Sequence, residues 1–190
     1  KVYDKAVEWS KIIDDLMKQY SSENNNLAID VCDPAGINAL NDNYNYKITN
    51  AQKFLEIARS IKSEDEIICM KAAVKTAEKG ISLMHESLQA GMTEEELWSI
   101  LHKTNIENGG EWFETRLLNS GPKTNPWFQE CSNRIIQKGE IVAFDTDMVG
   151  PYGYCADISR AFVVGNKFNE EQKKLYSMAM EQIDFNSRLI

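Results

Sequence analysis

The chain has 190 residues, of which 43% are hydrophobic, 9% aromatic and 26% charged. Its formal net charge of −8 argues against general binding to nucleic acid or to anionic membranes, because both repel an acidic protein. The aromatic and apolar content excludes a wholly disordered chain, and the length predicts one large globular domain or two small ones.

The cysteine pattern and the lack of long apolar runs indicate where the protein resides. Cys32, Cys69, Cys131 and Cys155 are scattered and form no Cys-x-x-Cys pair, which is typical of reduced thiols rather than of a disulfide framework. No apolar run approaches the roughly 20 residues that cross a bilayer, and the first residues do not resemble a signal peptide. We therefore expect a cytoplasmic protein with neither a membrane nor a nucleic-acid partner.

Residues 1–62 predict a small α/β unit. Apolar residues at helical spacing predict a first helix with one buried face, formed by Ala6, Trp9, Ile13, Leu16 and Tyr20. The apolar run 27–32 predicts a strand that ends at Asp33, and a helix beginning at Pro34 follows, with a loop over 41–45.

Two capping boxes predict a pair of helices after residue 62. Ser63 to Glu66 predicts the start of a long helix that ends at Gly91. Thr93 to Glu96 predicts a second helix, ended by Gly109 and Gly110, and the short joint makes the pair antiparallel. The apolar face expected for the long helix is Ile67, Met70, Val74, Ala77, Ile81, Met84 and Leu88. We place a domain boundary here and expect domains over 1–62 and 63–190.

The remainder of the chain predicts strands followed by a last helix. Turn residues separate short segments with strand character, and Asn169 to Gln172 predicts the cap of the last helix. The expected strands are 116–119, 140–148 and 154–164, with a loop over 120–126. Helices and strands in this order indicate an α/β or α+β fold.

Three aspartates in this region are predicted to converge. Asp145 and Asp147 are two apart in a predicted strand and therefore share one face. A hairpin centred near Tyr152 places Asp147 opposite Asp157, and cross-strand neighbours also share a face.

Three carboxylates at one place repel one another, and their neighbours make the repulsion harder to screen. The hairpin residues on both faces are small or apolar, so we expect neither face to be solvated. A pKa shift or a bound cation must then offset the repulsion, and hard divalent cations prefer oxygen ligands, often in two-metal sites. The alternative is an exposed edge hairpin whose acids serve solubility.

Other polar and aromatic residues are weaker candidates. His85 and His102 lie on predicted helices, where a histidine is more often structural than a ligand. The remaining candidates have simpler interpretations as solvated, packing or surface residues, and they are Glu111, Glu114, Glu130, Trp112, Trp127 and Arg160.

Residues 63–165 resemble the first half of the pita-bread fold of the creatinase, aminopeptidase P and methionine aminopeptidase family, peptidase family M24. Residues 1–62 resemble the end of the creatinase-type N-terminal domain. The resemblance depends on the long helix after Glu66, the Gly91-Met-Thr-Glu-Glu-Glu joint, Asn119-Ser-Gly-Pro, Lys138-Gly-Glu and Asp157-Ile-Ser-Arg160.

Two departures from the peptidases point to one branch of this family. The peptidases space their hairpin aspartates eleven apart, whereas Asp157 here follows Asp147 by ten and Asp145 by twelve. The peptidases also carry a histidine in the preceding loop, and residues 120–130 contain none. Both departures resemble the DddP-type dimethylsulfoniopropionate lyases, a resemblance that implies Asp145, Asp147 and Asp157 as ligands of two metal ions, with iron favoured.

The resemblance also implies a reaction, in which a small-molecule substrate undergoes β-elimination to dimethyl sulfide and acrylate. It places the catalytic base and the remaining ligands in the second half of the fold, so the catalytic residues stay unknown and we expect the chain alone to be inactive. It further implies a homodimer. The alternatives are an Xaa-Pro-type metalloaminopeptidase with manganese, cobalt or zinc, and an inactive pita-bread binding module.

Overall fold

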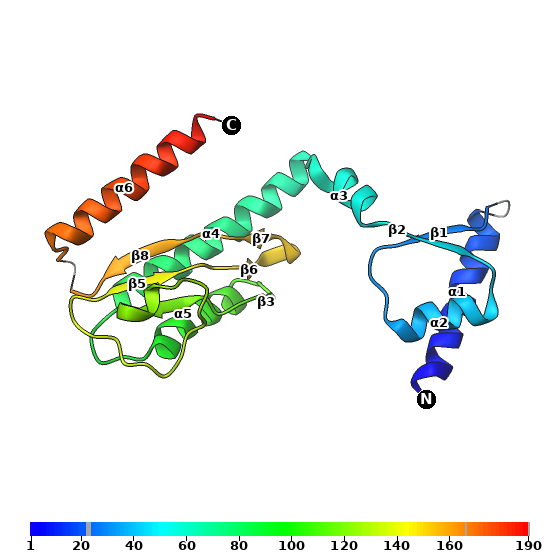
Figure 1. Ribbon diagram of the computed structural model, residues 1–190, viewed down its shortest axis with the longest axis horizontal. Coiled ribbons are helices and arrows are strands. Elements are labelled where there is room, and N and C mark those ends of the chain that lie inside the picture. Colours follow the sequence, from blue (N-terminus) through cyan, green and yellow to red (C-terminus); the bar gives the residue numbers. More distant parts are fainter. Residues whose placement is uncertain (22–23, 166, 190) are drawn as a thin grey trace. The chain divides into compact units, whose positions relative to one another are not determined.

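The structure is a computed structural model that describes residues 1–21, 24–165 and 167–189. Its contacts divide the chain into two units, Lys1–Ser63 and Glu64–Ile190, and each is described by itself (Figure 1). No helix within the described ranges combines the length and the apolar character needed to cross a membrane.

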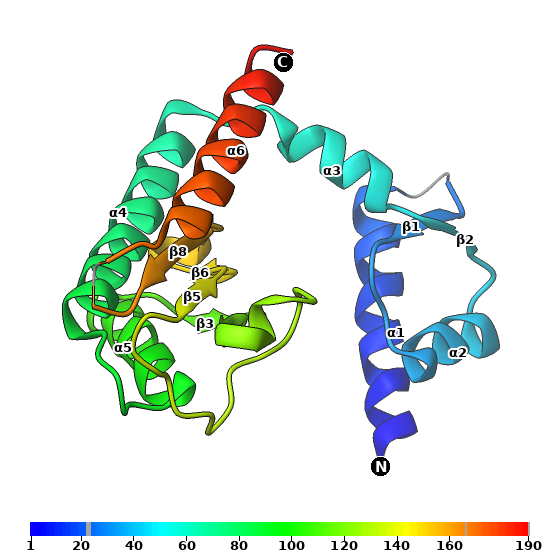
Figure 2. The same ribbon diagram turned by 60° about the vertical axis from the view of Figure 1, so that its left-hand side comes forward.

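The first unit is a small α/β unit, as predicted. Its elements are α1 (Val2–Tyr20), β1 (Asn26–Ile29), α2 (Pro34–Asn43), β2 (Lys47–Asn50) and α3 (Gln52–Ser60). The two strands are parallel, with Leu27 opposite Ile48, and α2 packs crosswise against α1 (Figure 2). The strand expected over 27–32 ends at Ile29, and the sequence patterns gave no signal for β2 or α3.

The second unit begins with the predicted antiparallel helices, α4 (Glu64–Ser87) and α5 (Glu94–Glu107). The capping box of α5 is present, since Thr93 N donates to Glu96 Oε2 at 2.7 Å and Glu96 N to Thr93 Oγ1 at 3.1 Å. The predicted apolar face of α4 is partly wrong, because Ile67 and Val74 are exposed. Small residues replace them at the interface, where the two helices approach closely, and the buried set is Ala73, Thr76, Ala77, Gly80, Ile81 and Met84.

Short strands form two sheets beside these helices. One has the order β3 (Trp112–Phe113), β6 (Met148–Val149), β7 (Cys155–Ala156), and the other β4 (Leu118–Ser120), β5 (Ile141–Phe144), β8 (Arg160–Val163). All pairings are antiparallel. Buried side chains of the strands join those of α4 and α5 in one core, which includes Met84, Leu97, Leu101, Val142, Phe144 and Met148.

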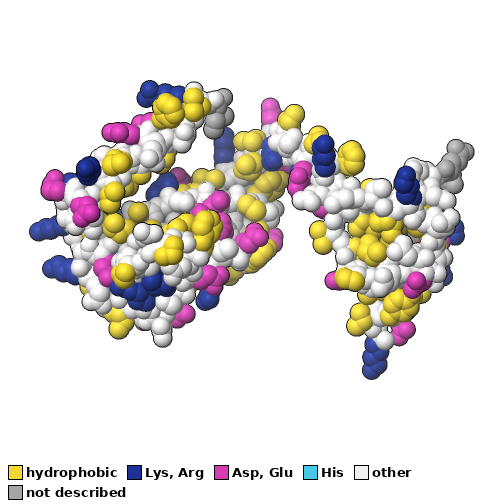
Figure 3. All heavy atoms as spheres, in the orientation of Figure 1, with side chains coloured by type: hydrophobic (Ala, Val, Ile, Leu, Met, Phe, Trp, Pro, Cys, Tyr) yellow, Lys and Arg dark blue, Asp and Glu magenta, His cyan; other side chains and the backbone are white. Residues whose placement is uncertain are grey.

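The last helix, α6 (Glu170–Ser187), starts beside the second sheet, where Gln172 Nε2 donates to Gly139 O at 3.1 Å. Asn169 and Gln172 form its predicted capping box. Along the rest of the helix large apolar side chains are exposed (Figure 3), and they include Leu175, Met178, Ile183 and Phe185.

Candidate metal centre

The hairpin that carries the aspartates has the predicted register but not the predicted strands. Instead of one strand over 140–148, β5 and β6 belong to different sheets, and residues 145–147 lie between them. Ile141 pairs with Val163 and Met148 with Ala156, so both ladders have the register of a hairpin centred on Tyr152. Each arm is therefore interrupted at the level of the acidic residues.

Thr146 explains the interruption. Its side chain is fully buried, and its hydroxyl donates to Ala156 O at 2.7 Å and accepts from Ile158 N at 2.9 Å. A side chain thus satisfies backbone groups that a regular ladder would pair with backbone. The next residue, Asp147, has a φ of 37°, in the left-handed region that aspartate tolerates better than most residues.

The structure brings Asp145, Asp147 and Asp157 together. One carboxylate oxygen from each lies within 4.8 Å of the others. Asp145 and Asp147 are half-buried, whereas Asp157 is exposed. The expectation that neither face of the hairpin is solvated is therefore wrong for the face that carries the aspartates. Each of the first two carboxylates accepts a hydrogen bond, because Thr146 N donates to Asp145 Oδ1 at 3.1 Å and Thr115 Oγ1 donates to Asp147 Oδ2.

The electrostatics of the cluster reflect the crowding of negative charge. A hydrogen bond with Asp145, burial and the charges of both neighbours raise the pKa of Asp157 to about 6. None of the ion pairs found in the described ranges involves these three aspartates. These three carboxylates, which form no ion pair within those ranges, are a donor set that fits a hard divalent cation, whose charge would offset their mutual repulsion.

A second polar network fixes the loop that precedes the hairpin. Glu94 is fully buried and accepts hydrogen bonds from Ser120 N and Ser132 N at 2.9 and 3.1 Å, from both serine hydroxyls, and from Lys123 Nζ at 2.8 Å. Burial raises the pKa of Glu94, but the hydrogen bonds from Lys123 and the serines outweigh it and hold that pKa below its ordinary value. From the sequence we expected Glu94 only in the first turn of a helix, where glutamates are common and exposed, so its buried role was not predicted.

The weaker candidates lie outside the carboxylate cluster. His85 is exposed with its ring 4.5 Å from that of Phe162, and His102 stacks on Phe113 at 4.1 Å. Glu130 forms an ion pair with Arg116. The rest are Glu111, Glu114 and Arg160, which are exposed, Trp112, which pairs in β3, and Trp127, which contacts Phe128.

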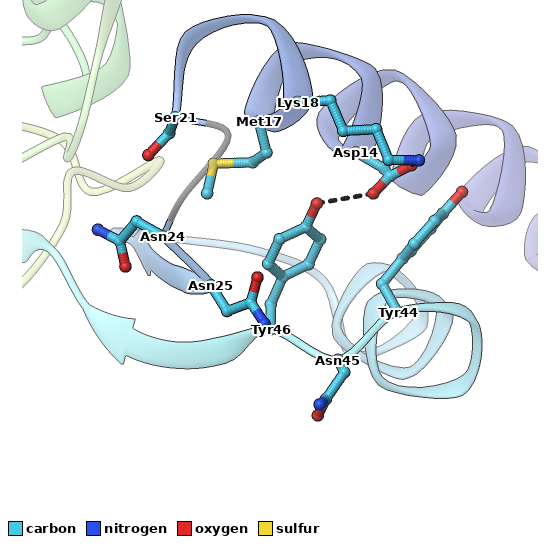
Figure 4. A pocket seen from close by; sticks show the side chains of 9 residues that line it. All are labelled: Asp14, Met17, Lys18, Ser21, Asn24, Asn25, Tyr44, Asn45 and Tyr46. Atoms are coloured by element: carbon cyan, nitrogen blue, oxygen red, sulfur yellow. Dashed lines mark hydrogen bonds and ion pairs between the residues drawn. The ribbon is translucent and has the colours of Figure 1, made fainter.

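A separate polar pocket of about 320 Å³ lies in the first unit (Figure 4). Asp14, which is buried, accepts hydrogen bonds from Lys18 Nζ at 2.6 Å and from Tyr46 Oη at 2.7 Å. These bonds hold the pKa of Asp14 below its ordinary value, while burial and Asp14 raise the pKa of Tyr46 to about 12. The carboxylate is satisfied by these partners and ties α1 to the start of β2.

Comparison with known proteins identifies relatives that match most of the chain. The model of metallopeptidase family M24 matches residues 68–184. The dimethylsulfoniopropionate lyase DddP of Roseovarius nubinhibens is 43% identical over 166 residues, which cover 85% of this chain and 37% of the relative. The DddP of Roseobacter denitrificans is 38% identical over 182 residues, which cover 92% of this chain and 40% of the relative. The chain thus spans about two fifths of the length of these curated relatives.

Among solved structures, the recombinant prolidase from Thermococcus sibiricus superimposes with a TM-score of 0.74 at 30% identity. The match covers 90% of this chain and 47% of the prolidase. The expected α/β architecture of a pita-bread metallopeptidase is therefore confirmed.

Proposed function

The chain belongs to metallopeptidase family M24, and on that premise we propose that the protein is a dimethylsulfoniopropionate lyase whose metal centre uses Asp145, Asp147 and Asp157. Enzymes of this family are dinuclear metalloenzymes. The observation that carries the proposal is the convergence of three carboxylates from an Asp-Thr-Asp segment and a cross-strand aspartate, in a chain 43% identical to a DddP lyase.

The spacing of the aspartates supports a lyase over a peptidase. Thr146 is buried and joins the two arms of the hairpin through its hydroxyl hydrogen bonds. The carboxylates that lie close to Asp157 are therefore those of the residues on either side of Thr146, Asp145 and Asp147. By the family resemblance, Thr146 takes the place of the hairpin aspartate of the peptidases, so this chain supplies two flanking carboxylates where a peptidase supplies one.

The proposed reaction is a β-elimination. A base removes a proton from the carbon next to the substrate carboxylate, a carbon–carbon double bond forms, and the carbon–sulfur bond breaks. The sulfur leaves with the bonding electron pair as dimethyl sulfide, and the remaining product is acrylate. A bound divalent cation supplies positive charge that offsets the negative charge developing beside the carboxylate.

Headspace analysis tests the lyase directly. The whole protein, loaded with iron or manganese, is incubated with dimethylsulfoniopropionate, and dimethyl sulfide is measured by gas chromatography. We expect release in the wild type and its loss in Asp147→Asn, with Asp184→Asn, an aspartate on α6, as the matched control. Absence of dimethyl sulfide together with release of the N-terminal residue from an Xaa-Pro peptide would refute the lyase.

Such peptide cleavage would favour the second candidate, an Xaa-Pro-type metallopeptidase. Its support is the 30% identity to a prolidase over nearly the whole chain. The two candidates share the metal centre and differ in the bond that is broken. A protein that performs neither reaction and contains no stoichiometric metal would be an inactive binding module.

Finer features of the proposal follow from the family resemblance and, for the location and the lack of a nucleic-acid partner, from the cysteine pattern and the net charge. We propose iron as the metal of the lyase, a homodimeric whole protein and a cytoplasmic location without a nucleic-acid partner. We also propose that residues 1–62 are the end of a creatinase-like N-terminal domain and 63–190 the first half of the pita-bread domain. Metal analysis of protein purified without added metal and light scattering check the first two.

A further inference from the structure

The carboxylate of Asp147 is held from a neighbouring strand. Thr115 Oγ1 donates a hydrogen bond to Asp147 Oδ2, and Glu114 N donates to Asp147 O at 3.0 Å. Two adjacent residues therefore fix both the side chain and the main chain of Asp147. Asp145 is held differently, since its Oδ1 accepts a hydrogen bond from Thr146 N within its own loop.

The support for Thr115 comes from the core rather than from the acidic loop. Thr115 follows β3, which pairs with β6 through Phe113 opposite Met148. Phe113 is 9% exposed and packs against the rings of Trp98 and His102, with centroids 5.6 and 4.1 Å away. The hydroxyl of Thr115 is thus presented to Asp147 by an element that is anchored in the core through Phe113.

A threonine suits this position because it is a neutral donor. One hydrogen bond to Oδ2 restricts the rotation of the carboxylate and adds no positive charge to the cluster. A lysine or arginine here would neutralise the charge that a cation needs.

We infer that Thr115 is a positioning residue, whose hydroxyl orients Asp147 so that a carboxylate oxygen faces Asp145 and Asp157 for a divalent cation. The inference rests on the proposed function in one respect, namely that these aspartates bind the metal. Loss of a hydrogen-bonding partner of this kind typically weakens metal binding about 10–100-fold.

Isothermal titration of the whole metal-free protein with Mn²⁺ tests the inference. Thr115→Val keeps the shape and removes the hydroxyl, Thr115→Ser keeps the hydroxyl, and Thr104→Val is a matched control. Thr104 is buried on α5 and donates to Ile100 O at 2.8 Å, outside the cluster. We expect Thr115→Val to weaken Mn²⁺ binding about 10–100-fold, while Thr115→Ser and Thr104→Val bind like the wild type.

A second readout does not depend on the metal. The carboxyl ¹³C chemical shift of Asp147 in the metal-free protein is expected to move in Thr115→Val and to stay in Thr115→Ser. Thr115→Ala replaces the valine variant should that variant not fold.

The outcomes separate the inference from the proposed function. Unchanged Mn²⁺ affinity in Thr115→Val, or an equal loss in the serine variant, overturns the role of the hydroxyl while the metal centre stands. A wild-type protein that binds no Mn²⁺ overturns the metal centre itself, and the positioning role falls with it.

Discussion

Replacing Thr146 with valine removes the two hydrogen bonds by which its hydroxyl joins the two arms of the acidic hairpin. Valine has nearly the same shape, so no cavity forms and only the hydroxyl is lost. Ala156 O loses its donor at 2.7 Å, and Ile158 N loses its acceptor at 2.9 Å. The substitution therefore isolates the two hydrogen bonds that replace regular backbone pairing at this level of the hairpin.

The magnitude follows from the burial of the two orphaned groups. A buried polar group left without a partner costs about 1–3 kcal/mol. Ala156 is 3% exposed, so its carbonyl incurs most of that cost, whereas Ile158 is only half-buried and its N–H incurs less. We expect Thr146→Val to lower the free energy of unfolding by about 2–4 kcal/mol.

Urea unfolding followed by circular dichroism measures the loss, with two variants for comparison. Thr146→Ser keeps both hydrogen bonds and is expected to lose only about 1 kcal/mol for the missing methyl group. Thr104→Val makes the same chemical change in α5, where the carbonyl of Ile100 keeps its helical backbone bond, and should cost less than about 1 kcal/mol. If Thr146→Val lowers the free energy of unfolding no more than Thr104→Val does, the two hydrogen bonds of Thr146 do not stabilise the hairpin as argued.

Three further predictions concern the loop before the hairpin and are measured by the same unfolding experiment. Glu94→Gln breaks the buried pair with Lys123 and is expected to cost about 3 kcal/mol; a neutral result would mean that the network does not anchor the loop. Gly121→Ala is expected to cost about 2 kcal/mol, because Gly121 has a φ of +53° and an added Cβ would lie 2.3 Å from Glu140 Oε1. Hydrogen bonds from Arg134 hold the pKa of Glu140 below its ordinary value of 4.5, so this stabilisation is present above pH 4.5 and is lost as the pH falls through the lower folded value. The stability difference between wild type and Glu140→Gln should therefore shrink in acid, and a constant difference would contradict the ion pair.

Local chemistry made much of the second unit predictable. The Thr93 and Asn169 capping boxes need only four consecutive residues each, and both are present. The register of the hairpin follows from its turn and from the alternation of its side chains, and both ladders have it. The break at residues 145–147 escaped prediction because it preserves that alternation, with Phe144, Thr146 and Met148 all buried.

The remaining differences depend on contacts between distant segments. The buried face of α4 is set by how closely its small residues let α5 approach, and apolar residues on both sides of the helix leave the choice open in the sequence. Thr115 lies 32 residues before Asp147, and no local pattern marks a hydroxyl as the partner of a distant carboxylate. Glu94 is similarly buried by a loop 26 to 38 residues away.

The central claim is that Asp145, Asp147 and Asp157 hold metal. Anomalous diffraction from crystals of the whole protein grown with Mn²⁺ tests it most directly. We predict anomalous peaks within about 2.0–2.6 Å of carboxylate oxygens from all three aspartates. A map with Mn²⁺ bound elsewhere, or with no peak between these side chains, would contradict it.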